Sequence, residues 1–146
     1  MPTVAYEDKL PLKTYLLGPD DPNPPWHKHE LIYPYSMQDN ITDETAVVDY
    51  RALHLENEFL HAIVLPELGG RLYSLYDKIG KRETFYRNNV VKYCLVARRG
   101  AWISGGIEFN FPKGHTCVTV APVLGRIQED DDGPEITVGC LTVSVA

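Results

Sequence analysis

The chain has 146 residues, of which 44% are hydrophobic, so it is long and apolar enough to bury a core, and wholesale disorder is excluded. Its 14 basic and 20 acidic residues give a net charge of −6, which leaves no overall basic field to attract nucleic acid or an anionic membrane. No apolar run approaches the roughly 18 residues of a membrane span, and the first residues lack the pattern of a signal peptide. We therefore expect a cytoplasmic protein.

The first part of the chain, residues 1–43, is predicted to be an irregular N-terminal arm packed on the core. Its proline-rich run at residues 19–25 is incompatible with a helix or a central strand. Aromatic residues follow this run, among them Trp26 and Tyr33, and aromatic side chains in an arm indicate that it packs against something.

The second part, residues 44–146, is predicted to be an antiparallel β-sandwich, because β-forming residues alternate there with polar ones between turns rich in glycine and proline. The expected strands lie at residues 46–56, 59–65, 71–76, 83–87, 117–127 and 136–145. Residues 88–114 hold few regular patterns but several glycines, as functional or closely packed loops do. The chain ends in mid-alternation, so we expect this sandwich to be a portion of a longer one.

The densest group of chemically useful side chains lies between Gly100 and His115. Glu108 and Asn110 are two residues apart, so an extended segment directs both to one side and directs Phe109 to the other, toward the core. Together with Trp102, these polar groups suit a sugar, because hydroxyls meet polar side chains and the apolar face of the ring meets an aromatic one. A buried polar network that fixes the loop explains the same residues equally well.

Arg71 follows a turn that contains Gly69 and Gly70, and it begins the next strand. From there a guanidinium can reach a substrate hydroxyl or carboxylate. The structural alternative is an ion pair with Glu67 or Glu108.

Neither a metal nor a cofactor is predicted. His27 and His29 form a pair that could bind a metal, but no third ligand is evident nearby. His54 and His61 fall within strands and are expected to be packed or paired. The sequence also lacks phosphate-binding loops, a dinucleotide fingerprint and a nucleophile elbow. The three cysteines, Cys94, Cys117 and Cys140, are an odd number without a close pair and are predicted to be buried thiols.

Four segments carry a resemblance to a known family: residues 33–35, 55–60, 65–71 and 100–112. Together they resemble an uncharacterised family of bacterial domains often found ahead of tetratricopeptide repeats. That family is placed in the galactose-mutarotase-like, or aldose epimerase, superfamily of β-supersandwiches. The string Gly-Gly-Ile-Glu-Phe-Asn-Phe-Pro is similar to a stretch of hexose-phosphate epimerase relatives, which have proline where this chain has Glu108.

The resemblance implies a sugar site. An epimerase of this superfamily opens and recloses a sugar ring with a general acid and a general base, commonly a histidine and a glutamate on a late strand. By resemblance, His115 and Glu108 are the catalytic candidates, while Arg71, Trp102 and Asn110 are the candidates for sugar contacts. Many members have a second histidine where this chain has Gly114.

The resemblance also implies that the chain is about half of a supersandwich, with the late glutamate beyond Ala146. Two functions stay open at this point. One is a carbohydrate-binding or carbohydrate-active domain with an incomplete catalytic site, and its partner would be a sugar or sugar derivative. The other is a non-catalytic module for interaction or oligomerisation. In either case bare strand edges tend to pair, so we expect a homo-oligomer formed through strand edges.

Overall fold

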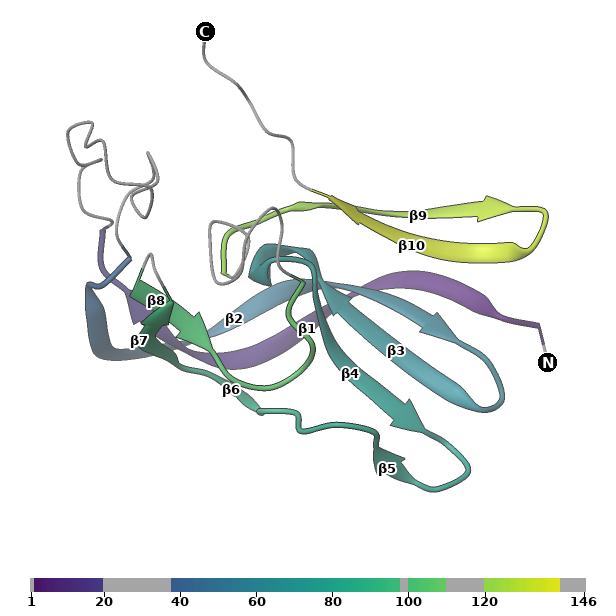
Figure 1. Cartoon of the computed structure of the whole chain (residues 1–146), viewed down its shortest axis with the longest axis horizontal. Coiled ribbons are helices and arrows are strands. Elements are labelled where there is room, and N and C mark those ends of the chain that lie inside the picture. The colour runs from purple at the N-terminus through teal and green to yellow at the C-terminus, as the bar shows by residue number, and fades with distance from the viewer. Residues whose placement is uncertain (1, 20–37, 98–99, 110–119, 140–146) are drawn as a thin grey trace, which may run out of the picture.

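A computed structural model of the chain describes residues 2–19, 38–97, 100–109 and 120–139 (Figure 1). The strands are β1 (Val4–Leu17), β2 (Ile41–Glu56), β3 (Leu60–Leu65), β4 (Arg71–Asp77), β5 (Arg82–Glu83), β6 (Val90–Val91), β7 (Tyr93–Ala97), β8 (Gly100–Ile103), β9 (Leu124–Asp130) and β10 (Gly133–Gly139). A short 3-10 helix, η1 (Pro66–Leu68), links β3 to β4. Within the described ranges, no helix has the length and apolar character needed to cross a membrane.

The main sheet has six strands in the order β5-β4-β3-β2-β1-β6, and every pairing in it is antiparallel except that of β1 with β6. The β9–β10 hairpin lies along one side of this sheet (Figure 1). Arg51 of β2 donates from Nη1 to the carbonyl of Gly125 in β9 at 2.8 Å, which ties the two layers together. The expected all-β sandwich is confirmed.

The hydrophobic core draws on most of the strands. Alternation along β2 directs Tyr50 and Ala52 to one face, where they are buried. The buried Thr14 hydroxyl lies 3.0 Å from the Tyr50 hydroxyl, so both groups are satisfied away from water. The buried core members are Leu12, Tyr50, Ala52, Ile63, Leu65, Leu68, Tyr73, Val91, Ala101, Ile103 and Val120.

The prediction of an irregular arm was wrong for its first part. Residues Val4–Leu17 form the 14-residue strand β1, which pairs along β2 from Val4↔Glu56 to Leu17↔Ile41. Pro11 and the charged residues before it make this segment resemble a loop. Pro11 is tolerated because β1 has no neighbour on its outer side there in the part of the chain described, and β6 pairs only with Lys13 and Thr14. The proline-rich run lies outside the described residues.

The loop expected at residues 88–114 holds more structure than its sequence indicates, since β6, β7 and β8 lie within it. The return strand expected at residues 83–87 is limited to Arg82–Glu83. Cys94 is half-buried rather than buried, and its thiol donates to the Trp102 carbonyl at 3.5 Å. Cys117 and Cys140 lie outside the described residues.

Candidate functional site

The turn between β3 and β4 places Arg71. Pro66 ends β3 and begins η1, and Gly69 and Gly70 then reverse the chain with φ values of 74° and 66°. The chain therefore enters β4 at Arg71, whose side chain is buried with only 3% of its surface exposed.

The loop after β8 is joined to the edge of β4. Ile107 and Leu72 exchange backbone hydrogen bonds of 2.9 and 3.1 Å. Gly106 has φ of 70°, and a Cβ at this position would lie 2.6 Å from the Leu72 carbonyl oxygen. Only glycine fits this close approach, which brings the residues after Gly106 over Arg71.

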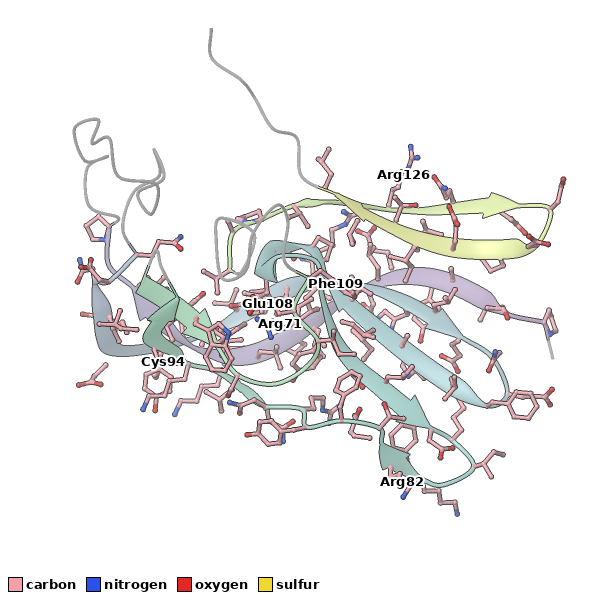
Figure 2. All side chains as sticks on the ribbon, viewed as in Figure 1. Arg71, Arg82, Cys94, Glu108, Phe109 and Arg126 are labelled. Carbon is pink, nitrogen blue, oxygen red and sulfur yellow. The ribbon has the colours of Figure 1, made fainter. Side chains whose placement is uncertain are left out.

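Three of the five predicted site residues meet at this point, and we call them the Arg71–Trp102–Glu108 cluster (Figure 2 labels Arg71 and Glu108). The Glu108 Oε2 atom accepts from the Trp102 indole N–H at 2.9 Å and lies 3.5 Å from the Arg71 Nη2 atom. Arg71 also donates from Nη1 to the Gly105 carbonyl at 2.7 Å. Of the two structural partners considered for Arg71, Glu108 is therefore correct and Glu67 is not.

The cluster holds its charges away from water. The Glu108 side chain is 12% exposed. Burial lowers the pKa of Arg71, and the nearby Glu108 carboxylate opposes that change. The Arg71 Nε–H has no hydrogen-bond partner within the described residues, although the atom is buried. A buried donor of this kind is costly unless a further group satisfies it.

The structure does not describe the other two predicted site residues. Asn110 and His115 lie outside the described residues, as do His27 and His29. Phe109 was expected to face the core, but 49% of its surface is exposed (Figure 2), because the bridge between Leu72 and Ile107 sets the orientation of this segment. Among the residues described, no group of three or more His, Cys, Asp or Glu side chains could hold a metal ion.

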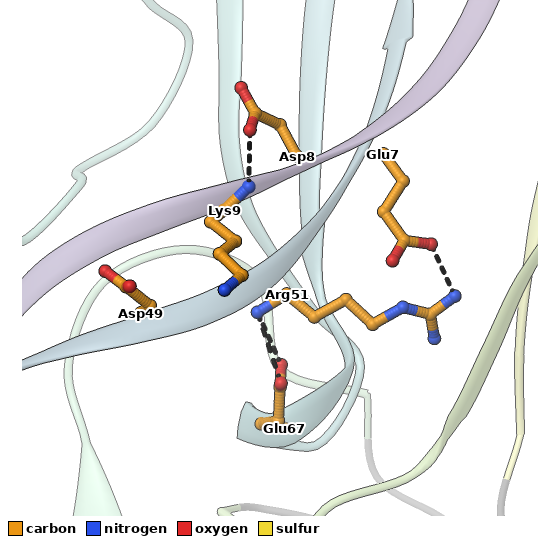
Figure 3. A pocket seen from close by; sticks show the side chains of 6 residues that line it. All are labelled: Glu7, Asp8, Lys9, Asp49, Arg51 and Glu67. Carbon is orange, nitrogen blue, oxygen red and sulfur yellow. Dashed lines mark hydrogen bonds and ion pairs between the residues drawn. The ribbon is translucent and has the colours of Figure 1, made fainter.

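Away from this cluster, a concave region encloses about 570 Å³ beside β1 and β2 (Figure 3), and it is lined by charged residues: Glu7, Asp8, Lys9, Asp49, Arg51 and Glu67. Several of them are engaged with one another. Arg51 Nη2 pairs with Glu7 at 2.7 Å and lowers the pKa of that carboxyl, while the Arg51 backbone N–H donates to both Glu67 oxygens at 3.1 Å. Through these contacts Glu67 stabilises β2 by accepting from a backbone N–H of that strand.

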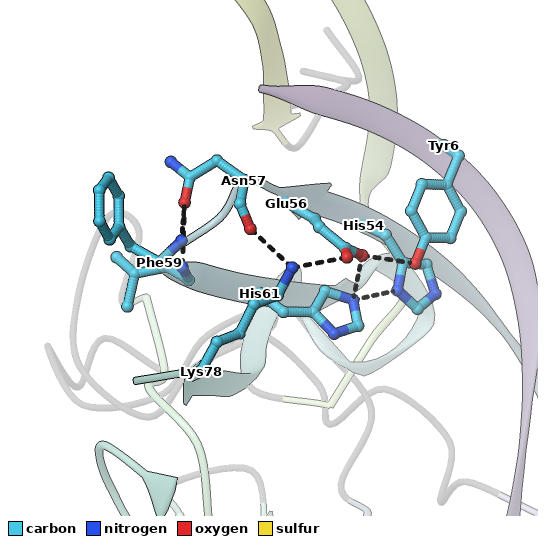
Figure 4. A network of polar contacts seen from close by, with 8 residues as sticks. Tyr6, His54, Glu56, Asn57, Phe59, His61 and Lys78 are labelled. Carbon is cyan, nitrogen blue, oxygen red and sulfur yellow. Dashed lines mark hydrogen bonds and ion pairs between the residues drawn. The ribbon is translucent and has the colours of Figure 1, made fainter. Parts of the chain in front are cut away.

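A polar network that the sequence did not reveal lies at the C-terminal end of β2 (Figure 4). It joins Tyr6 of β1, His54 of β2 and His61 of β3. His54 and His61 were expected to be packed or paired, and both are. Tyr6 was missed because its segment had been interpreted as an irregular arm, and only the register of β1 against β2 places it opposite His54.

The family model described as "Domain of unknown function (DUF5107)" matches residues 27–146. A solved structure, described as that of a TPR-domain containing protein from Parabacteroides distasonis ATCC 8503, is similar with a TM-score of 0.83 and 33% sequence identity. The match covers 94% of this chain and 24% of that one, so this chain spans about a quarter of the length of that protein.

These findings agree with the expectation of an uncharacterised domain that occurs in proteins with tetratricopeptide repeats. The chain belongs to the DUF5107 family of domains of unknown function.

Proposed function

We propose that this chain is the N-terminal portion of a galactose-mutarotase-like β-supersandwich and that it binds a sugar or sugar derivative at the Arg71–Trp102–Glu108 cluster. The observation that carries the proposal is the convergence of a guanidinium, an indole and a carboxylate from two distant segments at one point. Sugar sites combine these groups, since the indole face packs on the ring and the charged groups bond its hydroxyls.

The contacts favour binding over chemistry for this portion of the chain. Glu108 Oε2 already accepts from Trp102 and faces Arg71, which makes Glu108 a fixed acceptor in this arrangement. Arg71 is held by Gly105 and Glu108, and its Nε–H is the donor for which the described residues supply no partner. Asn110 and His115 stay candidates for the same site by their positions in the sequence. The catalytic site is proposed to be incomplete without a later glutamate.

The proposal is tested by titrating the full chain with aldoses and hexose 6-phosphates while backbone and indole N–H signals are followed by NMR. We expect saturable shifts at Arg71, the Trp102 indole and Glu108. We also expect Trp102→Phe, which loses the N–H but keeps an aromatic face, to weaken binding roughly fivefold. Tyr86→Phe is the matched control, because Tyr86 is 68% exposed and its side chain lies outside the cluster.

Two outcomes would overturn the proposal. If none of these sugars shifts any signal, the cluster is a structural network and the interaction-module alternative gains. If this chain alone accelerates mutarotation measured by polarimetry, the catalytic site is not incomplete.

A further inference from the structure

The network at the β2–β3 end of the main sheet contains two histidines in direct contact (Figure 4). His54 Nδ1 lies 2.9 Å from His61 Nε2, so the two rings meet edge to edge, with centroids 5.1 Å apart. On one face of His54, the Tyr6 ring stacks at 4.5 Å with the planes only 4° apart, and its centroid lies 6.4 Å from that of His61. Three aromatic rings from three neighbouring strands therefore form one group, in which His54 bonds to His61 through its edge and its face forms the Tyr6–His54 stack.

The contact between the two histidines depends on protonation. A ring nitrogen can donate only when it carries hydrogen and accept only when it does not. One proton between Nδ1 and Nε2 satisfies both atoms at 2.9 Å. Full protonation of both rings puts hydrogen on both of these atoms, which sets two donors and two positive charges against each other, so that state cannot keep this distance.

The charged neighbours of the histidine pair are engaged elsewhere. Glu56 Oε2 lies 3.7 Å from His61 Nε2, but it also accepts from the Tyr6 hydroxyl at 3.0 Å. The other Glu56 oxygen, Oε1, accepts from the Lys78 ammonium at 2.7 Å, so Lys78 already compensates much of the carboxylate charge.

Two further titratable groups face the pair from adjoining strands. Asp8 of β1 lies near His54, and Tyr76 of β4 is the cross-strand partner of His61. Burial lowers the pKa of His54, the positive charge of a protonated His61 lowers it further, and Asp8 and Glu56 oppose both effects. The folded state thus favours a neutral His54, which is 8% exposed.

The beginning of β1 is the segment that depends most on this stack. Between Val4 and Pro11 the strand has a described neighbour on one side only, since β6 reaches no further than Lys13 and Thr14. Val4 and Tyr6 are 48% and 40% exposed, so little apolar burial secures this end. Its main attachments are the ladder to β2, the Glu7–Arg51 ion pair, the Tyr6 stack on His54 and the Tyr6 bond to Glu56.

We propose that the His54–His61 pair is an acid-sensitive latch for β1: protonation of both rings opens the contact and releases the Val4–Asp8 end of β1 from β2. Because the unfolded imidazole titrates near pH 6.5, the stabilisation by a neutral His54 is fully present above about that pH. It is lost progressively as the pH falls toward the lower pKa of the folded state.

The test is amide hydrogen exchange on the full chain at about pH 7.5 and about pH 5, with each rate divided by the intrinsic rate at that pH. We expect protection of the Val4, Tyr6 and Asp8 amides, which face β2, to fall roughly tenfold at the lower pH. Protection in the β9–β10 hairpin, which is remote from the pair, should stay unchanged. Equal protection of β1 at both pH values would overturn the proposal.

A variant connects the effect to the histidines. In His61→Gln the side-chain amide can still bond to His54 but cannot acquire a charge in this range, so the loss of β1 protection at low pH should become smaller, and only the part caused by the burial of His54 should remain. If His61→Gln loses protection as the original chain does, the latch is wrong. If that variant does not fold, imidazole nitrogen NMR of the original chain decides: two independent titrations of His54 and His61 would equally overturn the proposal.

Discussion

Arg71 illustrates how a single buried charge constrains its surroundings. Its guanidinium is 3% exposed and is held by one carbonyl and one carboxylate, Gly105 and Glu108. A buried charge is tolerated only when such partners replace its lost hydration, and removing one partner costs more than the pair contributes. Whatever its role in ligand binding, Glu108 is therefore also needed for stability.

The substitution Glu108→Gln tests whether Glu108 stabilises the fold. The amide oxygen still accepts from the Trp102 indole N–H, but the negative charge opposite Arg71 is removed. We expect the free energy of unfolding to fall by roughly 3 kcal/mol, as for other buried pairs broken on one side. Urea denaturation measures this decrease in the free energy of unfolding. The double variant Arg71→Met, Glu108→Gln should recover much of that loss, and a single variant as stable as the original chain would contradict the prediction.

Tyr93 gives a prediction at alkaline pH. Burial and the neighbouring Tyr50 raise the pKa of Tyr93 to about 12. An unfolded tyrosine ionises near pH 10, so the neutral buried phenol loses its advantage as the pH rises through the interval between these values. At about pH 11 this loss should reach roughly 1 kcal/mol relative to pH 8.

The measurement is urea denaturation at both pH values, and Tyr93→Phe should reduce the alkaline loss. Tyr86→Phe, at a 68% exposed position, should leave it unchanged. An alkaline loss of the same size in Tyr93→Phe would show that other groups cause it.

At the scale of elements, the first strand shows how an edge can be protected. The Arg51 N–H points away from β1, toward Glu67. In an antiparallel pair the residue opposite Arg51, which is Lys9, then directs its own N–H away from β2, and the nitrogen of Pro11 faces the same way. At this outer edge the Lys9 N–H donates to the Asp8 carboxylate at 2.7 Å, and Pro11 has no backbone N–H. These features discourage pairing with another chain.

The bridge between the loop after β8 and strand β4 depends on Gly106. In Gly106→Ala the new Cβ would lie 2.6 Å from the Leu72 carbonyl oxygen, in a backbone conformation with φ of 70°. We expect a loss of roughly 2 kcal/mol in urea denaturation. The matched control is Gly139→Ala, where nothing lies within 4 Å of the added Cβ. Equal effects at the two positions would contradict the argument.

At the scale of the whole molecule, the two layers are unequal. The main sheet has six strands, whereas the β9–β10 hairpin has two, and each hairpin strand has one described neighbour. Because the outer edge of β1 is protected, the edges of β9 and β10 are better placed for the association that we proposed from the sequence.

Light scattering over a range of dilutions tests that association. We expect a dimer or larger assembly, and we expect Leu124→Lys, which adds a charge to an edge strand at a 61% exposed position, to shift it toward monomer. Val47→Lys, at a 71% exposed position of β2, is the control. A monomer at every concentration would contradict the prediction.

The amount of this structure that the sequence could predict differs from segment to segment. The strands from Leu60 to Asp77 were predicted closely, because alternation and the Pro66, Gly69 and Gly70 turn are local patterns. For β1 the local pattern was misleading, since Pro11 and neighbouring charges are acceptable only at an edge that pairing creates. In the candidate site, Arg71, Trp102 and Glu108 were selected by residue type, and the structure brings these three side chains into contact.

The sequence by itself determined the all-β class, the turn positions and the residues able to form a polar site, because these depend on short-range periodicity and side-chain chemistry. Tertiary structure alone decided that Arg71 pairs with Glu108 while Glu67 supports β2, and that Tyr6 stacks on His54 beside His61. The physical reason is register. Partners separated by 37 residues, as Arg71 and Glu108 are, meet only when strand pairing and a glycine-dependent bridge bring their segments together.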